Sequence, residues 1–205
     1  MKMLKGALVL LLILTTACSN TEETEKQEEK VMNETSVTVE PYALSDKEQL
    51  LVSKTGIDYS EFFLLNGKVA NTENIIYELV EFKNGGNEKV IMSSQGNPEE
   101  YKDELLSFVT NTLPTNNQME MILGTPGGSS GTDVSPIMSS WTSGKLLEDK
   151  VKLAKEKPLY IAGWAGTSKN SLRGLSSAAN GELPQGVKEA EVAYLYRLRL
   201  VDSNK

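Results

Sequence analysis

Residues 191–200 alternate strictly between two sets of side chains. One set is large and apolar and consists of Val192, Tyr194, Tyr196, Leu198 and Leu200. The other set is Glu191, Ala193, Leu195, Arg197 and Arg199. Because successive side chains of a β-strand point to opposite faces of a sheet, this period of two predicts a strand with one buried face. The segment therefore restricts the fold to one that contains a sheet.

Several other segments carry strand or turn signals. Residues 75–82 and 89–92 flank the turn sequence Asn84-Gly85-Gly86-Asn87 and predict the clearest hairpin of the chain. Further strands are predicted at residues 119–123, 137–141 and 159–164, and residues 61–65 are interpreted as a strand or a helical turn.

Three stretches carry helix signals. Ser45 and Glu48 form a capping box at the start of a helix predicted over residues 46–54. Asn97-Pro98-Glu99-Glu100 predicts the start of a second helix, over 98–110, whose apolar face holds Tyr101, Leu105, Phe108 and Val109. A third is predicted over 145–156 and ends before Pro158. Since helices and strands do not alternate regularly, we expect an α+β domain with a mainly antiparallel sheet and two or three short helices.

Two long segments, residues 124–136 and 165–187, are rich in glycine and serine and lack apolar periodicity. Such long connections are usually functional or mobile, although a brief helical turn near 172–179 fits the second one. If the two segments meet at one end of the sheet, a cleft for a polar ligand or short peptide is expected. The predicted binding residues in and beside them are Asp133, Trp141, Trp164 and Arg173. The alternative interpretation leaves two mobile loops and places both tryptophans in the core.

The chain contains no histidine and one cysteine among its 205 residues. Ser-His-Asp and Cys-His catalysis are therefore excluded, as are zinc sites that depend on histidine or several cysteines. Residues 127–131 match G-x-S-x-G, but without a histidine this match is interpreted as a flexible loop. We predict no catalytic residue, no metal and no cofactor; carboxylate chemistry is the main catalytic alternative.

The first 18 residues have the layout of a secretory signal peptide. Lys2 and Lys5 precede an apolar run at 6–14, and this run is shorter than the roughly 20 residues that span a bilayer. The following sequence, TTAC, resembles the lipobox of bacterial lipoproteins, with Thr15 where leucine is the commoner residue. The resemblance implies a diacylglycerol on Cys18 and cleavage before it. Ordinary cleavage after Ala17, which releases a soluble protein with a free thiol, is the alternative.

The expected domain organisation follows from that cleavage. We predict a signal peptide over 1–17, a lipidated cysteine with a flexible acidic stalk over 18–36, and one globular domain over 37–205. Removing Lys2 and Lys5 from the 21 basic residues leaves 19 against 28 acidic ones, a net charge of −9. An acidic chain disfavours nucleic acids and anionic lipid surfaces, so the lipid is expected to hold the protein to the membrane.

Three functions remain compatible with the sequence. The first is a non-catalytic lipoprotein on the extracytoplasmic face of a bacterial cell membrane, which binds a partner protein or a small polar ligand. The second is a carboxylate-based hydrolase that acts on cell-wall glycans outside the cytoplasm. The third is a structural subunit of a membrane complex.

Overall fold

The computed structural model describes residues 34–96, 98–113, 118–135, 138–177 and 181–203. Its compact unit begins at Thr35 and is built almost entirely from antiparallel strands. One sheet has six strands in the order β7 (Gly128–Val134), β6 (Gln118–Thr125), β5 (Glu100–Leu113), β2 (Tyr59–Lys68), β1 (Thr38–Pro41) and β9 (Val151–Lys152). The other has five strands in the order β4 (Asn87–Gly96), β3 (Glu73–Lys83), β11 (Val192–Asp202), β10 (Leu159–Thr167) and β8 (Ser140–Lys145).

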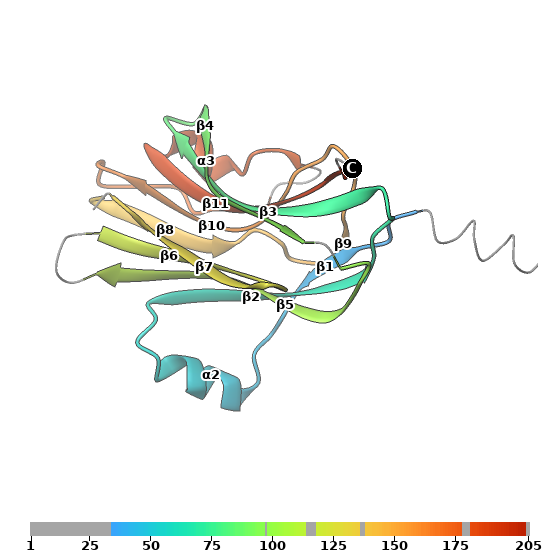
Figure 1. Cartoon of the computed structure of the whole chain (residues 1–205). Helices are drawn as coiled ribbons and strands as arrows, with labels where there is room; N and C mark the ends of the chain where they lie inside the picture. The colour runs from blue at the N-terminus through green and yellow to red at the C-terminus, as the bar shows by residue number, and fades with distance from the viewer. Residues whose placement is uncertain (1–33, 97, 114–117, 136–137, 178–180, 204–205) are drawn as a thin grey trace, which may run out of the picture. The chain divides into compact units, whose positions relative to one another are not determined.

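The two sheets stack face to face, and their inner side chains form the main core (Figure 1). Phe63 and Leu106 of the six-stranded sheet and Leu79 and Tyr196 of the five-stranded sheet are fully buried there. The expectation of a mainly antiparallel sheet with short helices is confirmed, with the strands divided between two layers. Among the described residues the helices are α2 (Asp46–Ser53) and α3 (Gln185–Glu189), and neither is long and apolar enough to cross a membrane.

Strand β11 confirms the alternation predicted for the end of the chain. Tyr194, Tyr196 and Leu198 lie on its inner face in the main core. Its outer face is covered as well, because Ala193 and Leu195 belong to a second apolar cluster. Leu172, Leu175, Leu183 and Val187, from the segment that follows β10, pack into this cluster. The predicted long connection therefore serves as a cover for the five-stranded sheet.

Local signals explain the elements that were predicted with the right type. Ser45 caps α2 and its hydroxyl accepts a hydrogen bond from the Glu48 amide, while the Glu48 carboxylate accepts one from the Ser45 amide at 2.8 Å. No residue of α2 is buried, so the helix depends on this capping rather than on the core. The predicted hairpin is also present, as β3 and β4 joined through Asn84, whose φ of 51° suits a tight turn.

The helix predicted over 98–110 is wrong, because this segment forms β5. It pairs with β2 on one side and β6 on the other, and Leu106 and Phe108 both face the main core. Apolar residues two apart match the pleat of a strand, and pairing on both edges outweighs a helix-start signal that is only local. The capping residue of that signal, Asn97, lies outside the described residues.

The helix predicted over 145–156 is wrong for a similar reason. Lys145 ends β8, and Val151–Lys152 is the short strand β9 beside β1. Leu146 enters the second cluster, whereas Leu147 enters the main core. Two adjacent leucines can point to opposite faces only if the backbone is extended. On a helix, neighbouring side chains are rotated by only about 100° around the axis.

The remaining differences concern the boundaries of strands and loops. The loop predicted over 124–136 includes the end of β6 and all of β7. The strand predicted over 137–141 begins only at Ser140, and no helical turn occurs over the described residues 172–177. The glycines and serines of β7 predicted a loop, because glycine is depleted in strands, but the backbone of β7 pairs with β6 along its whole length.

The predicted signal peptide, Cys18 and the stalk up to residue 33 lie outside the described residues. The last two residues assigned to the stalk contact the domain. The Ser36 amide donates to the carbonyl of Lys68 at 2.8 Å, and the Thr35 hydroxyl accepts from the Ala70 amide at 2.9 Å.

Candidate ligand-binding site

Two edge strands, one from each sheet, border a hollow of about 340 Å³. We call it the β4–β7 hollow. Strands β3 and β4 supply Tyr77, Ser94, Gln95 and Gly96, and Pro98 lies shortly before β5. The β6–β7 hairpin supplies Thr125, Pro126, Gly127, Gly128, Ser129 and Ser130. Because β4 and β7 are the ends of their sheets, no further strand pairs outside them among the described residues.

The hairpin wall of the hollow follows from its sequence. Pro126 and Gly127 connect β6 to β7, and Gly128 has a φ of 130°, which side-chain-bearing residues rarely adopt. The Thr125 hydroxyl donates to the carbonyl of Gly128 at 3.1 Å and closes the turn. Ser130 is the register partner of Leu123, which is buried in the main core. Since cross-strand partners share a face, Ser130 points into the space between the sheets.

The opposite wall places small polar side chains beside two buried tyrosines. Ser94 is the register partner of Tyr77, so both project to the inner face of the five-stranded sheet. Tyr101 reaches the same place from the start of β5. A Cβ atom at Gly96 would lie 2.6 Å from the Tyr101 hydroxyl oxygen and 3.1 Å from that of Tyr77. The absence of a side chain at Gly96 therefore leaves the room that both hydroxyls occupy.

The hydroxyls of Tyr77 and Tyr101 have no hydrogen-bond partner within the part of the chain that the structure describes. Each of these residues is only 1% exposed. Burial raises the pKa of both phenols and the nearby Glu104 carboxylate adds to the rise, so both stay protonated. The two hydroxyls also interact with each other, an interaction that raises the pKa of Tyr77 and lowers that of Tyr101. A buried polar group without a partner costs about 1–3 kcal/mol.

Neighbouring tyrosines are satisfied, which sets this pair apart. The Tyr194 hydroxyl donates to Glu81 at 3.0 Å, and the Tyr196 hydroxyl donates to the carbonyl of Gly124 at 2.9 Å. Tyr77 lines the hollow and the Tyr101 hydroxyl lies beside it, so a polar group from outside the chain could satisfy the hydrogen-bonding capacity that these phenols leave unused.

The lining of the hollow suits binding rather than bond cleavage. Its described residues include no carboxylate, lysine or arginine, and the inward-facing hydroxyls of Ser94 and Ser130 have no adjacent base among them. General acid–base chemistry and nucleophilic attack both require such a group. What the hollow offers is a set of neutral donors and acceptors beside the ring of Tyr77 and two prolines.

The four ligand-binding residues predicted from sequence do not line this hollow. Trp164 is 3% exposed and packs in the main core, with its ring centroid 6.0 Å from that of Tyr194. Trp141 is 61% exposed on edge strand β8, and Asp133 is exposed on edge strand β7 of the other sheet. Arg173 lies on the segment that covers the five-stranded sheet and pairs with Glu189 at 3.3 Å.

Sequence reasoning therefore found one wall of the hollow and missed the other. The segment at 124–136 was selected for its glycines and serines, and it supplies Thr125 to Ser130. Tyr77 belongs to the predicted hairpin, whereas Ser94 and Gly96 lie beyond its predicted end at residue 92. Continuing the register of the turn would pair Tyr77 with Ser93, but an irregularity between Leu79 and Val80 shifts the pairing to Ser94, and no sequence signal indicates this shift. Tyr101 was assigned to a helix face and could not be placed beside them.

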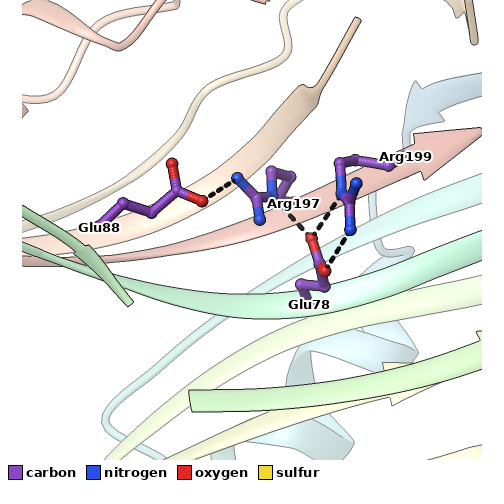
Figure 2. A network of polar contacts seen from close by, with 4 residues as sticks. All are labelled: Glu78, Glu88, Arg197 and Arg199. Atoms are coloured by element: carbon purple, nitrogen blue, oxygen red, sulfur yellow. Dashed lines mark hydrogen bonds and ion pairs between the residues drawn. The ribbon is translucent and has the colours of Figure 1, made fainter. Parts of the chain in front are cut away.

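A second polar cluster lies on the outer face of the five-stranded sheet (Figure 2). Arg197 donates to Glu78 at 2.7 Å and to Glu88 at 2.6 Å, and Arg199 donates to both carboxylate oxygens of Glu78 at 2.8 and 3.0 Å. Burial raises the pKa of Glu78, but Arg199 and Arg197 outweigh this effect and hold it below its usual range. Because its charges are already paired across β3, β4 and β11, this cluster joins strands rather than presenting a vacant site.

No protein-family model, curated protein or solved structure matches this chain.

Proposed function

We propose that this protein is a non-catalytic lipoprotein of the bacterial cell envelope that binds a small polar ligand in the β4–β7 hollow. The observation that carries the proposal is the pair of buried hydroxyls, Tyr77 and Tyr101, without partners beside a hollow of uncharged polar residues. Buried polar groups are normally satisfied, so each exception requires an explanation. A ligand that accepts hydrogen bonds from both phenols explains the pair.

The envelope location is supported by the amino terminus. The apolar run at 6–14, the sequence TTAC and the acidic tract that follows suit a protein exported, lipidated on Cys18 and held to the membrane through a tether. Two or more acyl chains anchor a protein stably, whereas the acidic chain itself is repelled by anionic lipids. On this proposal the ligand is met on the extracytoplasmic side.

A photocrosslinking amino acid at Ser130 tests the proposed site in living cells. Ser130 lines the hollow, faces the space between the sheets and is exposed, so the probe reports on an occupant without disturbing the core. After irradiation, the mass of the intact protein is measured. We expect an added mass with the probe at Ser130 and none with the same probe at Gly86, an exposed residue of the β3–β4 turn.

A blocking variant strengthens this experiment. Gly127→Trp would fill the mouth of the hollow, because the nearest atom to a Cβ at Gly127 lies 3.9 Å away. Gly86→Trp is the matched control, since a Cβ at Gly86 also has open space around it. The adduct should disappear in Gly127→Trp and persist in Gly86→Trp. Equal adducts at both probe positions, or none at Ser130, would contradict the proposed site.

A further inference from the structure

We infer that the ligand of the β4–β7 hollow is an uncharged saccharide, with one sugar ring seated between β4 and the β6–β7 hairpin. This inference rests on the proposed function and specifies its ligand class. Three properties of the hollow lead to it: the charge of its lining, the balance of its donors and acceptors, and its size.

The charge of the lining disfavours ionic ligands. None of the residues that the structure places around the hollow is charged, and the chain as a whole is acidic, with a net charge of −7 before any processing. A carboxylate or phosphate ligand is normally met by arginine, lysine or a cluster of amides. A cationic ligand is normally met by a carboxylate. A neutral ligand requires neither.

The polar groups of the hollow match those of a sugar. The hydroxyls of Ser94 and Ser130, which register places on the inner faces of their sheets, each donate and accept hydrogen bonds, as sugar hydroxyls do. The two phenols add donors at the buried end, where a ring or hydroxyl oxygen of the ligand would accept. Tyr77, Pro98 and Pro126 supply apolar surface for the C–H face of the ring.

The size and depth of the hollow favour one sugar ring over an added peptide strand. A volume of about 340 Å³ is near the lower end of the range for ligand pockets, about 300–1,000 Å³. A peptide that paired with β4 or β7 would bond to backbone groups along the sheet edge. Such a peptide would leave the hydroxyls of Tyr77 and Tyr101 unsatisfied, because they lie inside the edge.

Ligand-observed NMR with the purified full-length protein tests this inference. The probes are glucose and N-acetylglucosamine, with glucosamine and glucuronate as charged counterparts of similar shape. We expect saturation transfer to at least one neutral sugar and at least tenfold weaker binding of the charged ones. Gly127→Trp should abolish the transfer, and Gly86→Trp should leave it unchanged.

The role of the buried phenols is tested with Tyr77→Phe, which removes one hydroxyl and keeps the ring. We expect the dissociation constant of the bound sugar to rise at least tenfold, while Tyr42→Phe, which alters a surface tyrosine paired with Glu48, leaves it unchanged. Wild-type affinity in Tyr77→Phe would overturn the assigned contact. A thermal melt shows whether each tyrosine variant is folded. If Tyr77→Phe does not fold, the loss of sugar binding in Gly127→Trp still tests whether the sugar occupies the hollow.

The outcomes separate this inference from the function on which it rests. If no sugar binds up to tens of millimolar while the probe at Ser130 still gives an adduct in cells, the saccharide class is wrong and the site stands. If that adduct proves to be a peptide, a strand-adding partner replaces the sugar. If neither the sugars nor the cellular experiment shows an occupant, both proposals fall.

Discussion

Tyr77 and Tyr196 are both buried in the main core, but their hydroxyls have different surroundings. The Tyr196 hydroxyl donates to the carbonyl of Gly124 and so links the two sheets. The Tyr77 hydroxyl has no partner among the described residues and borders the hollow. At the scale of the residue, the same type of side chain therefore links the two sheets in one place and borders the hollow in the other.

Replacing each tyrosine with phenylalanine should change stability in opposite directions. Tyr77→Phe removes an unsatisfied buried donor and should raise the free energy of unfolding by about 1 kcal/mol in the absence of ligand. Tyr196→Phe leaves the Gly124 carbonyl without its partner and should lower the free energy of unfolding by about 1 kcal/mol. Urea denaturation of both variants measures the difference. A comparable loss of stability in both would show that Tyr77 has a hydrogen bond in solution.

Glu78 should make stability depend on pH in the acidic range. Arg199 and Arg197 hold its pKa in the folded state below the value of about 4.3 expected for an unfolded chain. The unfolded chain therefore binds the proton more readily, so the stabilisation is complete above that value and is lost as pH falls through the folded pKa.

The variant Glu78→Gln isolates this effect. At pH 7 it should be less stable than the wild type, because Arg197 is 6% exposed and would lose a charged partner. Thermal unfolding is measured for both proteins from pH 7 to pH 3. The difference in stability between the wild type and Glu78→Gln should become smaller below about pH 4. A difference in stability that stays constant across this range would mean that protonation of Glu78 does not contribute to the pH dependence of folding.

At the scale of the element, β11 is the strand on which the five-stranded sheet depends. It pairs with β3 from Val192 to Asp202 and with β10 on its other side. Its inner face contributes to the main core and its outer face to the second cluster and the arginine cluster. A strand covered on both faces has little freedom to change register, because a shift of one residue would reverse every side chain.

Leu198→Asp should prevent folding, because it places a carboxylate on the fully buried inner face of β11. An unpaired buried charge costs several kcal/mol, which is a large part of the stability of most domains. Leu105→Asp makes the same substitution on β5, where the side chain is 45% exposed, and should change stability by less than about 1 kcal/mol. Circular dichroism and solubility distinguish the two; a folded Leu198→Asp protein would contradict the observed burial.

At the scale of the whole molecule, the proposed anchor should govern where the protein resides. Cys18→Ser should block incorporation of labelled fatty acid and leave an uncleaved or unlipidated form. The melting temperature of the domain should stay the same, because the compact unit begins at Thr35. Metabolic labelling followed by membrane fractionation measures both effects. Wild-type protein that never incorporates the label would refute lipidation.

Features that depend on a few consecutive residues were predictable from sequence alone. The alternation from Val192 to Leu200, the turn at Asn84 to Asn87 and the capping box of Ser45 each specified their element correctly. In these cases the responsible interactions lie within the segment or across one turn, so the pattern of residues contains the physical cause.

Features that depend on partners far away in the chain were decided by the tertiary structure. Residues 100–113 form a strand because β2 and β6 pair with both of its edges, which no capping signal in the segment could reveal. The hollow likewise joins Tyr77 and Ser94 of one sheet with Ser130 of the other, and Tyr101 reaches it from the segment predicted as a helix. Local sequence determines which conformations are favourable, but the choice among them is made by burial and pairing across the two sheets.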